Sequence, residues 1–326
     1  MPENFKKILI RVPNWIGDGV LSIPATEAVK MAFPDAELTI MTRPWVSPIF
    51  NNNPYVDNII GYDINGRHRG FTGKLKLVGD IRKERFDLAI LFQNAFEAAL
   101  LTFLAGIPVR VGYKRDLRGP LLSHSINVDP LVLEKHQVFY YLTLLERFGI
   151  DVDDHPKPKL YITPEEENWG RESFVKEGMA GSIVVGMAPG ASYGPAKRWE
   201  SERFAELAER LIKKSEAKVI LYGGKGDFKV CQEIADKCGS NAFNFAGKTT
   251  LRQFIALLHL SSLLITNDSG PMHISAALDV PAVALFGSTD HTLTGPLSEN
   301  SVVIKKDIEC SPCFNRTCHE RHYRCL

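Results

Sequence analysis

Short runs of apolar residues alternate along this chain with longer segments in which apolar positions recur at helical spacing. A short continuous apolar run is typical of a strand buried on both faces, and the intervening spacing is typical of an amphipathic helix. Strands of this kind separated by helices predict an α/β protein with parallel sheets. The expected strands span 8–12, 38–41, 58–61, 88–92, 109–112, 183–187, 218–222, 242–245, 263–266 and 282–286, and the clearest helices span 202–214 and 251–260.

The alternation stops once, at residues 149–168, where three prolines and a group of acidic residues occur. Pro156 and Pro158 are incompatible with the interior of a helix, so we interpret this segment as a linker. It predicts two doubly wound domains, residues 1–158 and 159–326. Each is expected to bind ligands beyond the carboxyl ends of its strands.

Composition narrows the choice of partners and location. The chain has 326 residues, 44% of them hydrophobic, and a formal net charge of +1. So small a net charge gives no reason to expect nucleic-acid binding. No apolar stretch reaches the roughly 18 residues of a membrane-spanning helix, and residues 1–7 lead into a strand without a signal sequence. We therefore expect a cytoplasmic protein, a location compatible with binding at a membrane surface.

The strand that ends at Thr266 is followed by Asn267-Asp268-Ser269-Gly270-Pro271-Met272-His273. Pro271 suits the first helical position, because it lacks the N–H group that would need a partner there, and Gly270 would then form the cap. A helix that begins at the carboxyl end of a parallel strand favours phosphate through its free N–H groups and its dipole. This segment therefore predicts a binding site for a nucleotide phosphate.

Three side chains of the same segment are candidates for donor contacts. The hydroxyl group of Ser269 can donate to phosphate, and His273 lies within the first helical turn. Asp268 would be repelled by a diphosphate, so a role on sugar hydroxyl groups suits it better. The alternative is that Asp268 and Ser269 only cap the helix, for which both residue types are common.

A second loop of small residues, 188–199, follows the strand at 183–187. Small residues let the backbone approach phosphate closely, and Lys197 adds a mobile positive charge. The alternative is a surface loop with a solvated Lys-Arg pair. Two further turns, at 222–227 and 247–251, are weaker candidates for nucleotide contact, and the second contains a threonine suited to capping a helix.

In the first half, the strand at 8–12 leads into Pro13-Asn14-Trp15-Ile16-Gly17-Asp18-Gly19. Gly17 and Gly19 flank Asp18 at the start of a helix. A single carboxylate at a strand end is a poor phosphate ligand but suits a general base. The alternative is that Asp18 is the N-cap of the helix.

Two groups of basic residues in the first half suggest an anionic acceptor, although most basic runs are only solvated surfaces. They are Arg67, His68, Arg69, Lys74 and Lys76, and then Lys114, Arg115 and Arg118.

Four of the six cysteines lie near the end of the chain, as Cys310-x2-Cys313-x4-Cys318-x6-Cys325. In a reducing compartment, this spacing suits either a tetrahedral zinc site or free thiols, with His319 and His322 as spare ligands. We favour reduced thiols or redox-labile pairs and expect no metal.

Three segments together resemble the bacterial lipopolysaccharide heptosyltransferases of glycosyltransferase family nine. They are Asn14-Trp15-Ile16-Gly17-Asp18, Gly190-Ala191-Ser192-Tyr193-Gly194-Pro195-Ala196-Lys197-Arg198-Trp199 and Asp268-Ser269-Gly270-Pro271-Met272-His273. The first two resemble heptosyltransferase II in particular. The resemblance extends over nearly the whole chain, with the segments in a consistent order.

This resemblance implies a GT-B fold, in which two Rossmann-like domains face each other across a cleft. The donor would be ADP-L-glycero-β-D-manno-heptose, bound by the C-terminal domain. The acceptor would be the lipid A–Kdo–heptose inner core, bound by the N-terminal domain at the cytoplasmic face of the inner membrane. Transfer would invert the anomeric configuration without a metal or other cofactor. The family also implies a further helix beyond Leu326.

The resemblance also implies roles for single residues. Asp18 would deprotonate the acceptor hydroxyl, and Lys197 would neutralise charge on the departing ADP. Ser192, Ser269 and Gly270 would bind the diphosphate, and Asp268 and His273 would position the donor.

Other classes remain as alternatives. Another ADP- or NDP-sugar glycosyltransferase, or a nucleotide-sugar epimerase of GT-B fold, would use a similar donor site, and an epimerase would consume the donor without an acceptor. A dehydrogenase is disfavoured, because the first strand lacks the Gly-x-Gly-x-x-Gly fingerprint. A non-catalytic member of a polysaccharide-assembly complex would bind nucleotide without turnover.

Overall fold

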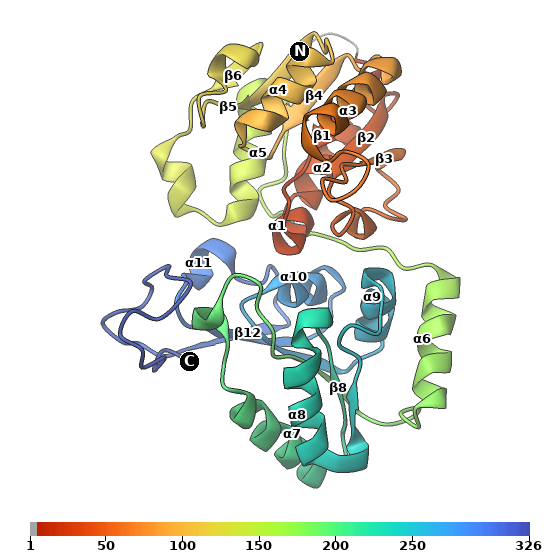
Figure 1. Ribbon diagram of the computed structural model, residues 1–326, viewed down its shortest axis with the longest axis vertical. Helices are drawn as coiled ribbons and strands as arrows, with labels where there is room; N and C mark the ends of the chain where they lie inside the picture. Colours follow the sequence, from red (N-terminus) through yellow and green to blue (C-terminus); the bar gives the residue numbers. More distant parts are fainter. Residues whose placement is uncertain (1–4) are drawn as a thin grey trace. The chain divides into compact units, whose positions relative to one another are not determined.

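The computed structural model describes residues 5–326. The prediction that residues 1–7 contain no signal sequence falls partly outside the described residues, because residues 1–4 are not described. The chain forms two compact units, Met1–Lys159 and Leu160–Leu326 (Figure 1). Each unit contains one parallel six-stranded sheet with helices, so the predicted α/β class is confirmed.

The N-terminal unit contains the five strands that the apolar runs predict and one more. The strands pair in the order β3-β2-β1-β4-β5-β6, so the chain begins in the middle of the sheet. The sequence of β6 is His-Ser-Ile and is mostly exposed at the sheet edge, so no apolar run marked it. The bounds are β1 (Lys7–Arg11), β2 (Glu37–Thr42), β3 (Asn58–Gly61), β4 (Leu88–Leu91), β5 (Val109–Tyr113) and β6 (His124–Ile126).

Helices cover both faces of this sheet. Helices α2 and α5 pack against each other, and α3 and α4 pack against each other over a core that includes Leu9, Ala89 and Leu91 (Figure 1). The helices are α1 (Ile16–Leu21), α2 (Ile23–Ala32), α3 (Gly70–Glu84), α4 (Phe96–Leu104) and α5 (Gln137–Phe148).

The C-terminal unit repeats this topology, with the order β12-β11-β10-β7-β8-β9. The five predicted strands are present, and β12 is an additional edge strand, partly exposed, that follows a polar turn. The bounds are β7 (Val184–Ala188), β8 (Lys218–Leu221), β9 (Ala242–Asn244), β10 (Leu263–Asn267), β11 (Ala282–Phe286) and β12 (Ser301–Lys305).

In this unit α6 packs against α9, and α7 packs against α8. The linker prediction extends too far, because α6 begins inside it: the Thr163 side chain and Glu166 form a capping box, and Pro164 occupies the first turn, where proline is tolerated. Within residues 5–326, no helix is both long and apolar enough to cross a membrane. The helices are α6 (Pro164–Lys176), α7 (Ser201–Ser215), α8 (Phe228–Cys238), α9 (Leu251–His259), α10 (Gly270–Ala277) and α11 (His291–Thr294).

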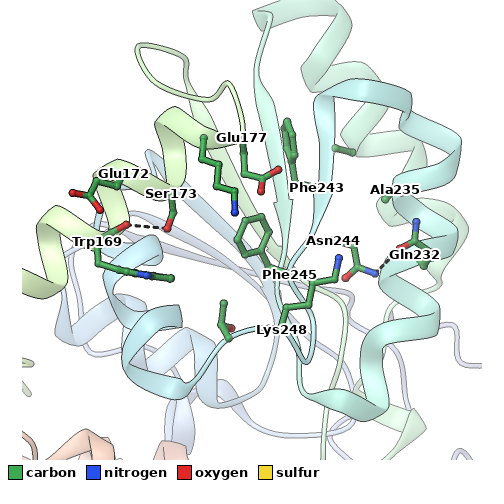
Figure 2. Close-up of a pocket in the computed structure, with 13 residues that line it drawn as sticks. Trp169, Glu172, Ser173, Glu177, Gln232, Ala235, Phe243, Asn244, Phe245 and Lys248 are labelled. Atoms are coloured by element: carbon green, nitrogen blue, oxygen red, sulfur yellow. Dashed lines mark hydrogen bonds between the residues drawn. The ribbon is translucent and has the colours of Figure 1, made fainter.

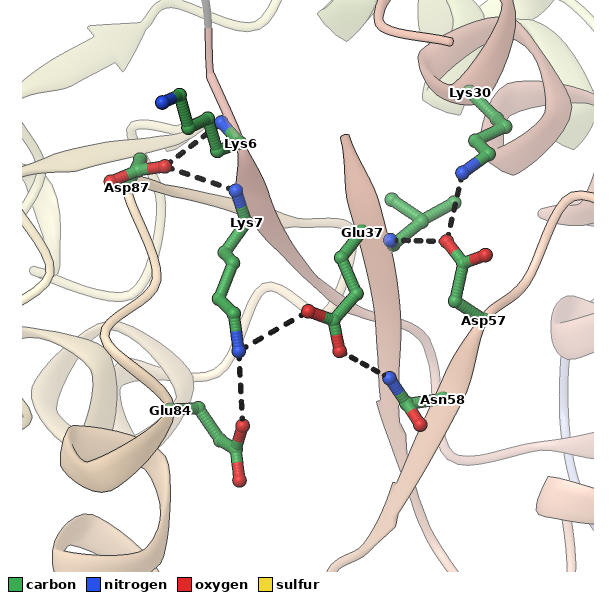
Figure 3. Close-up of polar contacts among 9 residues, drawn as sticks. Lys6, Lys7, Lys30, Glu37, Asp57, Asn58, Glu84 and Asp87 are labelled. Atoms are coloured by element: carbon green, nitrogen blue, oxygen red, sulfur yellow. Dashed lines mark hydrogen bonds and ion pairs between the residues drawn. The ribbon is translucent and has the colours of Figure 1, made fainter. Parts of the chain in front are cut away.

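Polar contacts hold together the strand beginnings of the N-terminal sheet (Figure 3). The carboxylate of Asp87 accepts the backbone N–H groups of Lys6 and Lys7 at 2.9 and 3.0 Å. The ammonium group of Lys7 lies 3.2 Å from Glu37 and 3.5 Å from Glu84. Such exposed ion pairs add little to the stability of the fold, but they pair the charged side chains at this edge with one another. The opposite edge, where the strands end, is the one available for ligands.

Candidate functional site

The loops after β7, β10 and β11 lie at one edge of the C-terminal sheet, because these parallel strands are neighbours. Thr266 of β10 pairs with Ala188 of β7, so two loops that are far apart in sequence begin side by side. The sheet therefore brings together segments that the sequence singled out separately. The donor-binding residues expected in these loops and in α10 are Ser192, Lys197, Asp268, Ser269, Gly270 and His273.

A buried ion pair joins the two loops. The ammonium nitrogen of Lys197 lies 2.5 Å from Oδ2 of Asp268, and the two side chains are only 12% and 5% exposed. The hydroxyl group of Thr289 donates to the same carboxylate oxygen. The ring of Tyr193 lies 4.8 Å from the Lys197 nitrogen. Lys197 is therefore a held cation and neither mobile nor solvated, whereas Arg198, the other member of the pair in the alternative, is exposed.

The side chain of Asn267 fastens the loop that carries Lys197. Asn267 is fully buried at the end of β10. Its Oδ1 accepts the backbone N–H of Trp199 at 3.1 Å, and its Nδ2 donates to the carbonyl of Pro189 at 2.8 Å. One amide thus ties both ends of the β7–α7 loop to β10. No role was predicted for Asn267, although it directly precedes Asp268 in the sequence.

The start of α10 differs from the expectation by one position. Ser269 is the N-cap, Gly270 is the first helical residue and Pro271 is the second, which proline also tolerates. The Ser269 side chain makes no capping bond and instead donates to the carbonyl of Asn267 at 3.2 Å. The alternative that Asp268 and Ser269 serve only as caps therefore does not hold for their side chains. The first turn keeps the N–H geometry that suits an anion.

The remaining expected residues differ in accessibility. Ser192 is exposed in the β7–α7 loop, whereas His273, the fourth residue of α10, is 6% exposed. In the neighbouring turns, Asp227 accepts the backbone N–H of Gly224 at 2.9 Å, and Thr250 caps α9 as expected. The turn at 222–227 is thus closed by its own carboxylate.

The C-terminal segment packs against the same loop, which the sequence analysis did not anticipate. The Tyr193 hydroxyl donates to the carbonyl of Phe314 at 2.6 Å, and the Ala196 N–H donates to the carbonyl of Arg316 at 3.0 Å. A Cβ atom at Gly194 would lie 2.3 Å from that Arg316 carbonyl, so only glycine permits this approach. The cysteine-rich segment therefore supports the loop that carries Lys197.

The cysteines of this segment are free thiols. Backbone N–H groups around Tyr323 lower the pKa of Cys318, whereas burial raises the pKa of Cys325. Among residues 5–326, no three His, Cys, Asp or Glu side chains lie together in a way that could hold a metal ion.

A pocket of about 660 Å³ lies beside the sheet edge formed by β9, between α6 and α8 (Figure 2). Trp169, Phe243 and Phe245 supply its aromatic wall, and Lys248 and Thr249 line it at the carboxyl end of β9. None of the expected donor-binding residues lines it. Its nearest link to the expected site is the 247–251 turn.

In the N-terminal unit, Asp18 lies in the first turn of α1 and is partly exposed. The N-cap is Trp15, so the alternative that Asp18 is the cap is wrong. A carboxylate in the first turn is favoured by the helix dipole. Burial and the charge of Asp18 raise the pKa of Tyr141 well above its usual value. A protonated hydroxyl group therefore lies in the electrostatic environment of Asp18.

Two buried arginines fix the loop that precedes Asp18. Oδ1 of Asn14 accepts from Arg11 at 2.6 Å and from Arg43 at 3.2 Å, and the Trp45 indole donates to the Asn14 carbonyl at 2.9 Å. Burial and the nearby charge of Arg43 lower the pKa of Arg11 to about 9. Arginine does not contribute to the hydrophobic periodicity from which buried positions are predicted, so this network was not expected.

The predicted basic groups are only partly available to an anion. Arg118 is fully buried, where it donates to the carbonyl groups of Tyr113, Gln93 and Leu91, and burial lowers its pKa to about 10. His68 is buried as well, and burial together with Arg67 lowers its pKa. These two residues support the fold, which corrects their assignment to an acceptor surface.

Comparisons with known proteins place this geometry in a family. The profile of glycosyltransferase family 9 (heptosyltransferase) matches residues 74–324. The chain is 32% identical over 310 residues to lipopolysaccharide heptosyltransferase 2 of Salmonella typhimurium, a match that covers 92% of this chain and 88% of the relative.

Solved structures agree with the sequence match. The E. coli ADP-heptose lps heptosyltransferase II superposes with a TM-score of 0.81 at 31% identity, covering 92% of this chain and 91% of that one. A glycosyl transferase family 9 protein from Veillonella parvula superposes with a TM-score of 0.85 at 26% identity, covering 93% and 87%. The GT-B class expected for the two doubly wound units is confirmed. By sequence and by fold, this chain belongs to glycosyltransferase family 9, the heptosyltransferases.

Proposed function

We propose that this protein transfers L-glycero-D-manno-heptose from ADP-heptose to the first heptose of the lipopolysaccharide inner core, with inversion at the anomeric carbon. The observation that carries the proposal is the buried Lys197–Asp268 pair beside the start of α10. It places a held cation next to a helix N-terminus at the carboxyl edge of a doubly wound sheet, which is a suitable environment for a diphosphate. The match to lipopolysaccharide heptosyltransferase 2 supplies the sugar and the acceptor.

The donor side of the reaction is assigned to the C-terminal unit. The first-turn N–H groups at Gly270, with the Ser192 and Ser269 hydroxyls, bind the diphosphate. Lys197, held in place by Asp268, stabilises the negative charge that develops on the diphosphate as the glycosidic bond breaks. Asp268 and His273 hold the heptose, and Asn267 holds the loop at both ends.

The acceptor side is assigned to the N-terminal unit. The Asp18 carboxylate takes the proton of the acceptor hydroxyl, whose oxygen forms a bond to the anomeric carbon of heptose. The bond from that carbon to the diphosphate oxygen breaks at the same time, and its electron pair leaves with ADP. This single displacement inverts the anomeric centre and needs no metal or cofactor.

The partners follow from this reaction. The donor is ADP-L-glycero-D-manno-heptose, and the acceptor is a lipid A–Kdo–heptose core. Because that acceptor is anchored by its lipid, the enzyme works at the cytoplasmic face of the inner membrane as a peripheral protein.

The test uses ADP-heptose with two defined lipid A cores, one ending in Kdo and one carrying the first heptose, followed by mass spectrometry. We expect a mass gain of one heptose only on the second core. Consumption of ADP-heptose without any acceptor would indicate an epimerase instead. Equal use of other NDP-sugars would indicate a different glycosyltransferase.

Matched variants test the residue roles. Asp18→Asn should lower kcat by about 10² to 10⁴ while Glu165→Gln, a carboxylate in the first turn of α6, should not. Lys197→Met should lower kcat by about 10² to 10³, whereas Lys213→Met on the exposed surface of α7 should leave it unchanged. Near-normal turnover of Asp18→Asn would contradict the base assignment.

A further inference from the structure

Helices α3 and α4 of the N-terminal unit lie alongside each other and are tied at two levels. The Lys74 ammonium group lies 2.5 Å from the Glu97 carboxylate, and Arg82 donates to the carbonyl of Leu104 at 2.5 Å. Positions 74 and 82 on α3 thus correspond to positions 97 and 104 on α4. The two helices therefore run parallel and in register, and their outer sides form one surface.

That surface exposes large apolar side chains instead of burying them. Phe71 and Leu75 are 76% and 48% exposed, one helical turn apart on α3. On α4 they are joined by Phe96, Phe103 and Leu104, which are 44%, 46% and 40% exposed. The opposite sides of both helices are buried in the core. We call these five residues the α3–α4 face.

Basic residues are concentrated in α3 and the segment that leads into it. Residues 67–85 contain seven lysines and arginines and two acids, a formal charge of +5 in a chain whose total is +1. The two acids are already engaged, Asp80 with Arg67 at 2.6 Å and Glu84 with Lys7 at 3.5 Å. The guanidinium group of Arg110 lies 5.3 Å from the ring of Phe103.

From this combination we infer that the α3–α4 face is a docking surface for an anionic phospholipid bilayer. Exposed aromatic and aliphatic side chains can enter the boundary between headgroups and acyl chains, while the nearby cations bind acidic headgroups. Five large apolar side chains exposed on two adjacent helices are typical of an interaction site. The charge selects an anionic bilayer over a neutral partner. The inference rests on the proposed function only for its biological purpose, delivery of the enzyme to a lipid-anchored acceptor.

The binding assay measures co-sedimentation of the full chain with vesicles, without substrates. Phosphatidylcholine vesicles should not bind it, whereas vesicles containing about one third phosphatidylglycerol should, and added salt should weaken the binding. The pair Phe71→Gln with Phe103→Gln should weaken binding by about tenfold or more. The pair Arg69→Gln with Lys76→Gln should weaken it by about 30-fold.

Controls separate docking from folding and catalysis. Met31→Gln replaces an apolar side chain of α2 that is 72% exposed and should leave vesicle binding unchanged. Transfer to a deacylated core oligosaccharide should be normal in the Phe71→Gln with Phe103→Gln pair and in Met31→Gln, since that acceptor needs no membrane. Loss of this activity in the wild type would refute the proposed function and leave the vesicle result standing.

Three results would overturn the inference. They are equal binding to neutral and anionic vesicles, unchanged vesicle binding by both variant pairs, and a salt-insensitive dimer that the Phe71→Gln and Phe103→Gln pair converts to monomer. The last would show that the α3–α4 face pairs with a second copy of the chain instead of a bilayer.

Discussion

Replacing Asp268 by asparagine tests the central feature of the proposed donor site. The change keeps the shape of the side chain and removes the charge that faces Lys197 at 2.5 Å. Both side chains are largely excluded from water, so solvent cannot compensate for the loss. The variant therefore leaves a buried ammonium group without its counterion.

The size of the effect follows from burial. Removing one partner of a buried ion pair costs about 3 to 5 kcal/mol, because the remaining charge stays desolvated. For a unit of this size, each kcal/mol shifts the midpoint of thermal unfolding by about 2 to 4 °C. We expect the unfolding transition of the C-terminal unit to fall by roughly 6 to 20 °C, measured by calorimetry in the absence of nucleotide.

ADP should reverse part of this loss. Its diphosphate supplies the negative charge that Lys197 lacks in Asp268→Asn, and the carboxylate that would repel it is gone. The increase in the unfolding midpoint on adding saturating ADP should therefore be larger in the variant than in the wild type. Turnover should still fall, because the proposed contact of Asp268 with the heptose is also lost.

An ion pair of equal length provides the control. Arg171 and Glu167 also lie 2.5 Å apart, but on the surface of α6 with side chains 63% and 37% exposed. Glu167→Gln should leave the unfolding midpoint nearly unchanged, because solvent screens this exposed pair. If Asp268→Asn were as mild as this control, or if ADP stabilised the variant less than the wild type, the counterion argument would be wrong.

Three further variants test other features of the fold. Asn267→Ala removes two buried hydrogen bonds, so we expect a loss of about 2 to 4 kcal/mol by denaturant unfolding and a higher KM for the donor; an unchanged KM would show that the amide does not position the loop. Burial raises the pKa of Glu27 to about 7, so the folded state holds a proton that the unfolded state has lost between about pH 4.5 and 7. Stability should fall as the pH rises through that window, by at most about 3 kcal/mol because solvent screens this partly buried group, and Glu27→Gln should flatten the profile; parallel profiles would contradict the assignment. Arg118→Ala should destabilise the protein by more than about 3 kcal/mol, whereas Arg115→Ala should be close to neutral, and equal effects would refute a structural role for Arg118.

The sequence alone determined the fold class and most of the strands. The apolar runs at 88–92 and 282–286 predicted buried parallel strands, which the structure contains as β4 and β11, because a short continuous apolar run is typical of a strand covered on both faces. The turns after β7 and β10 were recognisable as candidate ligand sites, because small residues and a helix start follow a strand end. The edge strands β6 and β12 were missed, since an edge strand needs no apolar run.

Only the tertiary structure decided how the chemical groups combine. The adjacency of β7 and β10 places Lys197 against Asp268, and it gives Asn267 its two partners on a loop some 70 residues away in sequence. The burial of Arg118 removed it from the expected basic surface. Hydrophobic periodicity is a local property that one segment can carry, whereas the partner of a buried charge or amide is fixed by strand order and by contacts between distant segments. A single sequence therefore shows the hydrophobic periodicity, whereas the partners of buried charges and amides become visible only in the folded chain.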